Sequence, residues 1–193
     1  GSRCESMTHI ALGSMRVQGT QMAVGQAVGT AAALCLKYGT DARGLGRSRI
    51  ADLQQLLLKD DQYIPNLRNE DPLDLMCSAK ATATSCADGG SPEGVLDGVA
   101  RPVDKFVHGW VSDPSCPLPQ TLTLTFGKPV SVGEVRLAFD SNLTPLRIKE
   151  RMPPALVKAY AVEGLADGRW IPLVDERENF LRHRVLRFPA HVL

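Results

Sequence analysis

Two side chains near the start of the sequence could take part in proton transfer or anion binding. Arg16 can hold an anionic group through paired hydrogen bonds from its planar guanidinium. His9 could relay a proton, because an imidazole gains and loses a proton near neutral pH. The alternative for this pair is a hydrogen-bonded histidine and a surface arginine. The other histidines, at His108, His183 and His191, are scattered along the sequence, and we assign them no role.

The stretch that follows Arg16 is the most unusual part of the sequence. Residues 19–36 are nearly all small or apolar, and Gly25 and Gly29 stand four positions apart. In a solvent-facing helix each glycine would cost about 1 kcal/mol relative to alanine. Glycines at this spacing therefore indicate that a backbone or a flat ligand comes very close. The start of such a helix, at residues 20–23, would offer unpaired N–H groups and the positive end of the helix dipole. The alternative is a tightly packed helix without a ligand.

Together with residues 13–17, this stretch resembles the last cofactor-binding segment of the FAD-dependent oxidoreductase family, which has a two-dinucleotide-fold architecture. The matching run extends from His9 to Ala33. In that family the helix directs its N-terminus at the flavin ring, so the resemblance implies FAD as cofactor and hydride or electron transfer as chemistry. It implies cofactor contacts from Arg16, Val17, Thr20, Gln21, Met22, Gly25, Ala27 and Gly29. It also implies that His9 and Arg16 face the substrate side of the flavin as catalytic residues.

The Gly-x-Gly-x-x-Gly phosphate-binding loop of that family has no counterpart in this sequence. Residues 44–49 imitate its first half, but Arg49 stands at the third glycine and no strand precedes it. We therefore reject these residues as a dinucleotide loop. Both ends of the chain look cut, so we expect a fragment that binds FAD weakly or not at all by itself. The parent protein would bind FAD and act on a small-molecule substrate.

Around these residues, the sequence predicts helices in the first part of the chain and strands in the rest. One helix is expected from about Thr20 to Lys37, closed by Gly39 in the left-handed conformation. A second is expected to begin with Ser48 as its N-cap and to end at residues 59–61. Strands are expected at residues 79–85, 121–126, 130–139, 156–162, 170–174 and 183–188.

The predicted strands resemble the discoidin-like, coagulation-factor type C family of β-sandwich modules. The segments that match in order and spacing are residues 81–85, 95–98, 110–112, 122–129 and 132–137. The resemblance implies an α+β chain from a bacterial FAD-dependent oxidoreductase. Residues 1–76 would be the C-terminal helical segment of the FAD-binding domain, packed on residues 77–193, a discoidin-like antiparallel β-sandwich that could be truncated.

Many sugar-binding members of the discoidin-like family hold a structural calcium ion near an Asp-Gly turn, and Asp97 matches its carboxylate position. Calcium needs several oxygen ligands at once. However, His108 stands where a threonine or serine oxygen is usual, and the late acidic ligand falls beyond Leu193 or is missing. We therefore expect no complete metal site. We interpret Trp110 as a core residue rather than a sugar platform, and residues 142–154 as the longest candidate binding loop.

Other clusters of reactive side chains have simple interpretations. The acidic residues between Asp60 and Asp74 could suggest a metal site, although a solvated connection explains them better. The five cysteines include no Cys-x-x-Cys pair, which favours free thiols and leaves a Cys86–Cys116 bridge open. Residues 142–144 fit a glycosylation sequon.

Composition and charge argue against several classes of function. A net charge of +1 and an aromatic content of 5% give nucleic-acid binding no electrostatic or stacking support. The apolar stretch contains two glutamines and falls short of the roughly 20 apolar residues that span a membrane.

The sequence thus predicts a fragment of an FAD-dependent oxidoreductase that contributes the flavin-facing helix and an accessory β-sandwich. The alternative is a carbohydrate- or protein-binding β-sandwich without catalytic activity. A third interpretation makes the β-sandwich a structural cover. If the glycine-containing helix keeps its apolar surface exposed, we also expect the fragment to self-associate.

Overall fold

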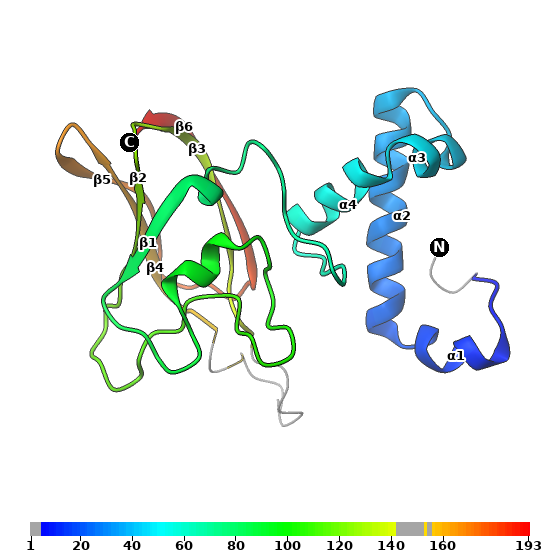
Figure 1. Cartoon of the computed structure of the whole chain (residues 1–193), viewed down its shortest axis with the longest axis horizontal. Coiled ribbons are helices and arrows are strands. Elements are labelled where there is room, and N and C mark those ends of the chain that lie inside the picture. The colour runs from blue at the N-terminus through cyan, green and yellow to red at the C-terminus, as the bar shows by residue number, and fades with distance from the viewer. Residues whose placement is uncertain (1–4, 142–152, 154–155) are drawn as a thin grey trace. The chain divides into compact units, whose positions relative to one another are not determined.

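The computed structural model describes residues 5–141, 153 and 156–193, and it divides the chain into two compact units (Figure 1). Unit 1 is Gly1–Asp74 and unit 2 is Leu75–Leu193. Helices come first and antiparallel strands follow, which confirms the predicted α+β class. The predicted sequon, and all of the candidate binding loop at 142–154 except Pro153, lie outside the described residues.

Unit 1 is built around one long helix. Its helices are α1 (His9–Met15), α2 (Gln18–Tyr38), α3 (Ala42–Ser48) and α4 (Ile50–Lys59). The predicted helix at about 20–37 is confirmed as α2, and Gly39 closes it in the left-handed conformation, with φ 60°. The other helices contact α2 (Figure 1). The core of the unit consists of Leu34, Leu45 and Leu57, one from each of α2, α3 and α4.

The prediction that Ser48 caps the second helix is wrong. Ser48 is the last residue of α3, where its hydroxyl donates to the Gly44 carbonyl at 2.9 Å. The next helix, α4, begins at Ile50, and Arg49 occupies its N-cap position without a side-chain hydrogen bond. Sequence analysis did not foresee α3, which Asp41 starts by accepting the Gly44 N–H on its carboxylate at 2.6 Å.

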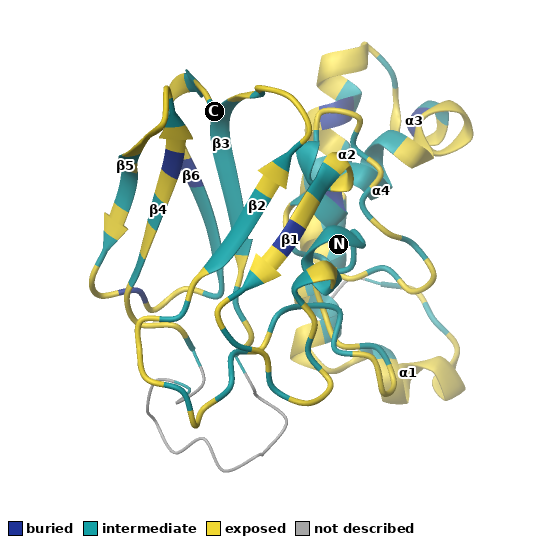
Figure 2. Ribbon diagram, turned by 60° about the vertical axis from the view of Figure 1, so that its left-hand side comes forward, coloured by how far each residue is buried: buried dark blue, intermediate teal, exposed yellow. Residues whose placement is uncertain are grey.

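Unit 2 contains strands that pair two by two. The elements are the 3-10 turns η2 (Leu75–Ser78) and η3 (Pro92–Leu96) and the strands β1 (Ala79–Ala83), β2 (Leu122–Phe126), β3 (Ser131–Ala138), β4 (Tyr160–Ala166), β5 (Arg169–Glu176) and β6 (His183–Val192). The described residues form three antiparallel ladders, β1–β2, β3–β6 and β4–β5. Because β4 contacts β6, two ladders lie side by side, and Figure 2 shows the order β5, β4, β6, β3.

The strand predicted at 156–162 begins later, at Tyr160, because a buried asparagine binds the residues before it. The Asn179 side chain donates to the Val157 carbonyl at 2.8 Å, and its backbone N–H donates to the Lys158 carbonyl at 2.7 Å. These carbonyls are therefore satisfied without a partner strand. At its other end β4 runs on to Ala166 and turns into β5 through Asp167 and Gly168, whose positive φ values of 49° and 72° suit a tight hairpin.

The last strand is longer than predicted because it passes through a proline at an irregularity. The predicted strand ends at Phe188, but β6 continues to Val192. Pro189 lacks a backbone N–H, which normally excludes proline from the middle of a ladder. The register between β3 and β6 shifts at Gly133, between Val132 and Glu134, opposite this proline. The extra residues of β6 there let the ladder resume beyond Pro189.

The cysteines of the described residues carry free thiols at Cys35, Cys77, Cys86 and Cys116. The Cys86–Cys116 bridge that the sequence left open is not formed. The Cys86 thiol instead donates to the Gly90 carbonyl at 2.7 Å.

Within the part of the chain that the structure describes, no helix has both the length and the apolar character to cross a bilayer.

Candidate functional site

The N-terminal end of α2 has no side-chain cap. Val17 occupies the N-cap position with an extended backbone and makes no side-chain hydrogen bond to the helix. The first helical bond runs from the Gln21 N–H to the Val17 carbonyl at 3.1 Å, so the preceding amides of the first turn have no acceptor within the helix. The first turn also carries no acidic residue. A helix of 21 residues therefore begins with N–H groups that have no acceptor within the helix, at the positive end of its dipole.

Two of the predicted cofactor residues bind the corner between α1 and α2. The Thr20 hydroxyl donates to the Ser14 carbonyl at 3.3 Å. The Gln21 amide nitrogen donates to the Met15 carbonyl and lies 3.3 Å from a carboxylate oxygen of Glu5. The side-chain oxygen of Gln21 is buried and has no hydrogen-bond partner among the described residues. The hydrogen bonds of Thr20 and Gln21 thus fix the direction of α1 relative to α2.

The glycines of α2 lie on its outward side. Met22 is 75% exposed and Leu36 is 86% exposed, and Gly25 and Gly29 lie on the same stripe at helical spacing. Outside the adjacent residues and the backbone of the same helix turns, no described atom lies within 4 Å of a Cβ placed on either glycine. Packing inside unit 1 therefore does not explain these glycines. Ala27 is half-buried and stands two turns before the buried Leu34, on the side opposite the stripe.

The two predicted catalytic residues lie at opposite ends of α1. His9 is its first residue and Arg16 is its C-cap, and both are exposed. Seven residues are two helical turns, so both side chains project from one side of α1 with about 10 Å of helical rise between them. Arg16 directly precedes Val17, the N-cap residue of α2.

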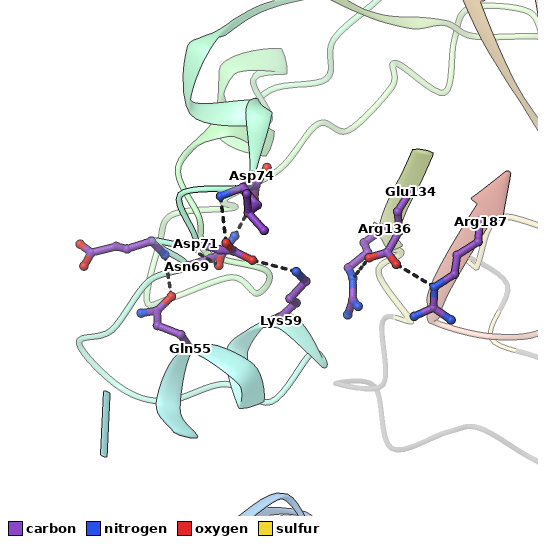
Figure 3. Close-up of polar contacts among 10 residues, drawn as sticks. Gln55, Lys59, Asn69, Asp71, Asp74, Glu134, Arg136 and Arg187 are labelled. Carbon is purple, nitrogen blue, oxygen red and sulfur yellow. Dashed lines mark hydrogen bonds and ion pairs between the residues drawn. The ribbon is translucent and has the colours of Figure 1, made fainter. Parts of the chain in front are cut away.

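The acidic connection after α4 forms ion pairs and hydrogen bonds within unit 1 (Figure 3). Lys59 Nζ lies 2.7 Å from an Asp71 carboxylate oxygen, and the Asn69 amide donates to Asp74 at 2.5 Å. In the described parts of the chain, no group of three or more histidine, cysteine, aspartate or glutamate residues could hold a metal ion.

A second cluster in Figure 3 joins β3 to β6. One carboxylate oxygen of Glu134 accepts from Arg136 at 2.7 Å, and the other accepts from Arg187 at 2.8 Å. The hydrogen bond from Arg136 lowers the pKa of Glu134 most; burial opposes this shift, and the hydrogen bond from Arg187 lowers the pKa further.

The Asp-Gly turn of unit 2 contacts the loop that precedes Trp110. His108 Nδ1 lies 2.6 Å from Asp97 Oδ2, and Asp97 Oδ1 accepts the Val99 N–H at 2.8 Å. Trp110 is half-buried, and its indole N–H donates to the Ser85 carbonyl at 2.8 Å. Trp110 is therefore held in the fold, although it is half-buried and does not belong to the buried core that the sequence suggested.

The exposed tryptophan of unit 2 is a different one, which the sequence analysis treated only as part of a strand. Trp170 is 60% exposed and faces its cross-strand partner Leu165, which is 47% exposed. The signal in the sequence is the pair Asp167–Gly168, which marks a tight hairpin and places its flanking residues opposite each other.

Comparison with known families finds a match in unit 1. Residues 1–57 match the model of a family described as FAD dependent oxidoreductase. The match covers 57 of the 193 residues. It includes α1, α2 and α3 and ends in α4 at Leu57, a buried core residue. This match supports the predicted FAD-dependent oxidoreductase portion at these residues. No curated protein and no solved structure matches the chain.

Proposed function

We propose that residues 1–57 form one wall of the flavin site in a longer FAD-dependent oxidoreductase, with α2 as the helix that faces the flavin. The observation that carries this proposal is the uncapped start of α2 inside the segment that matches the family. When bound, FAD supplies hydride or electron transfer with a small-molecule substrate.

The start of α2 would bind the most electron-rich edge of the cofactor. Its unpaired N–H groups can donate to carbonyl or anionic oxygens, and the helix dipole favours negative charge there. Val17 leaves this end open because it offers no side-chain acceptor. Thr20 and Gln21 support the site by bonding to the corner with α1.

The outward side of α2 carries Met22, Gly25, Gly29 and Leu36. It would allow the cofactor, or a neighbouring strand of the flavin domain, to approach closely. Gly25 and Gly29 have open space where a Cβ would project, and Met22 lies next to them on the surface. Further apolar side chains of unit 1 are also exposed, with Ile10 at 92% and Val17 at 56%. Such a surface is expected of helices that are covered in a longer protein.

His9 and Arg16 would act on the substrate side of the flavin. Arg16 would orient an anionic group of the substrate through paired hydrogen bonds. His9 would accept or donate a proton near neutral pH. Their separation along α1 leaves space between them for a small molecule.

The phosphate groups of FAD need a binding loop from elsewhere in such a protein. Residues 44–49 do not supply it, because residues 44–48 belong to α3 and no strand precedes them among the residues that the structure describes. The 193-residue chain alone would therefore hold FAD weakly or not at all.

The test compares three glycines that all have open space at the Cβ position. Gly25→Leu and Gly29→Leu would fill the proposed contact, whereas Gly46→Leu would add the same side chain to α3. We expect the first two variants of the longer protein to lose bound FAD and the third to retain it. Equal FAD content in all three would overturn the proposed role of α2.

A second function, glycan binding by unit 2, is favoured by one observation. Trp170 and Leu165 present an exposed aromatic and apolar surface at the β4–β5 hairpin. An aromatic ring of this kind can stack on the apolar face of a sugar. A glycan array would support this function if binding depends on dose and disappears in Trp170→Ala. Binding to no glycan would remove it.

A further inference from the structure

The Asp-Gly turn of unit 2 differs from the calcium site that the discoidin-like resemblance implies. We infer that the His108 imidazole takes the place of the cation there, so that the turn is locked by a side-chain contact and not by calcium. The inference concerns unit 2 and is independent of the proposed flavin site.

Both oxygens of the Asp97 carboxylate already have a partner within the chain. Oδ2 lies 2.6 Å from His108 Nδ1, and Oδ1 accepts the Val99 N–H at 2.8 Å. A calcium ion would have to compete with these two contacts for the lone pairs of the carboxylate.

The ligand atoms at this turn also differ from those that calcium prefers. Calcium takes six to eight oxygen ligands, whereas His108 presents a ring nitrogen. Across the described residues, no cluster of three or more histidine, cysteine, aspartate or glutamate side chains surrounds this turn or any other place. The acidic side chains at this turn therefore supply fewer oxygen ligands than the ion needs.

The fold holds the His108 imidazole beside Asp97. Its φ of 47° lies in the left-handed region, which residues other than glycine seldom adopt. The neighbouring Gly109 carbonyl accepts the Ser91 N–H at 3.2 Å. A Cβ placed on Gly94 would lie 2.6 Å from the Gly109 backbone nitrogen, so the His108 loop is pressed against η3. This packing fixes the backbone that carries the imidazole to Asp97.

The test is the thermal unfolding of the 193-residue chain, followed by tryptophan fluorescence, in EDTA and in about 10 mM calcium chloride. Both tryptophans, Trp110 and Trp170, lie in unit 2. We expect the same midpoint in both solutions. A calcium site with a millimolar or tighter dissociation constant would instead raise the midpoint by roughly 3 °C or more, and that result would overturn the inference.

A double-mutant cycle tests the contact itself. Asp97→Ala and His108→Ala should each lower the midpoint, and the two effects should be non-additive because each change removes the same contact. Asp88→Asn, at an exposed aspartate in the same unit, should leave the midpoint unchanged. Additive effects would contradict the proposed contact, and the calcium comparison on the unmodified chain decides the question if either alanine variant does not fold.

Discussion

Asn179 is the buried polar side chain of unit 2 on which several segments depend. It is 3% exposed, and its amide group donates to the carbonyls of Val157 and Leu181 and accepts from Arg184. Because Asn179→Ala would remove all of these hydrogen bonds from a buried position, we expect it to lower the free energy of unfolding by about 2 kcal/mol. Urea unfolding followed by tryptophan fluorescence measures this loss. The exposed neighbour Glu178 provides the control, and an equal effect of Glu178→Ala would contradict the role of Asn179.

The hydrogen bonds of the Glu134 carboxylate predict that the stability of the fold depends on pH. Its pKa in the folded chain is lowered, chiefly by the hydrogen bond from Arg136. The group therefore stabilises the fold above about pH 4.3, the ordinary pKa of a glutamate, and this contribution is lost as the pH falls through the lower folded pKa. Arg187 is 72% exposed, so the contribution is about 0.5 kcal/mol. Glu134→Gln should be less stable than the unmodified chain at pH 7 and equal to it near pH 3, and a constant difference in urea unfolding would contradict this.

At the scale of elements, replacing glycine by alanine should have opposite effects on stability within α2 and at its C-cap. Gly25→Ala and Gly29→Ala should each stabilise α2 by about 1 kcal/mol, because the Cβ meets no atom. Gly39→Ala should destabilise it by about 1 kcal/mol, because Gly39 has φ 60°. Helical circular dichroism during heating reports on α2. A loss of stability in the first two variants would show that the stripe is packed in the isolated chain.

The sequence predicted α2 and its end because a long apolar run followed by a glycine is a local signal. It missed α3 because Gly44 and Gly46 lower helix propensity, while the Asp41 cap that compensates depends on local geometry. The start of β4 could not be predicted, because it depends on Asn179 some twenty positions later in the chain. Pro189 would have ended β6 by any local rule, and only the paired strand explains its continuation.

The candidate site was predictable only in part for the same reason. Its location at the start of α2 followed from residue types and resemblance. Residue types could not show which residues support the site instead of facing the cofactor. The side chains of Thr20 and Gln21 do so, because they bond to carbonyls six residues earlier. Sequence spacing also could not show that Ala27 lies on the inner side of α2 and the two glycines on the outer side.

At the scale of the whole molecule, the exposed apolar surface of unit 1 predicts self-association of the isolated chain. Ile10, Met22 and Leu36 are 92%, 75% and 86% exposed. Burying such side chains between copies removes apolar surface from water. Light scattering should give an apparent mass that rises with concentration, and Met22→Lys with Leu36→Lys should suppress the rise. A monomer mass at every concentration would disprove self-association.

The flavin content of the longer protein tests the central claim most directly. The measurement is the near-visible absorbance of that protein, purified without added cofactor, beside the 193-residue chain. Our account predicts flavin absorbance in the longer protein and none in the chain, because α2 supplies one wall of the site and the phosphate-binding loop comes from elsewhere. Absence of flavin from both would contradict the oxidoreductase assignment and leave unit 2 as the functional part.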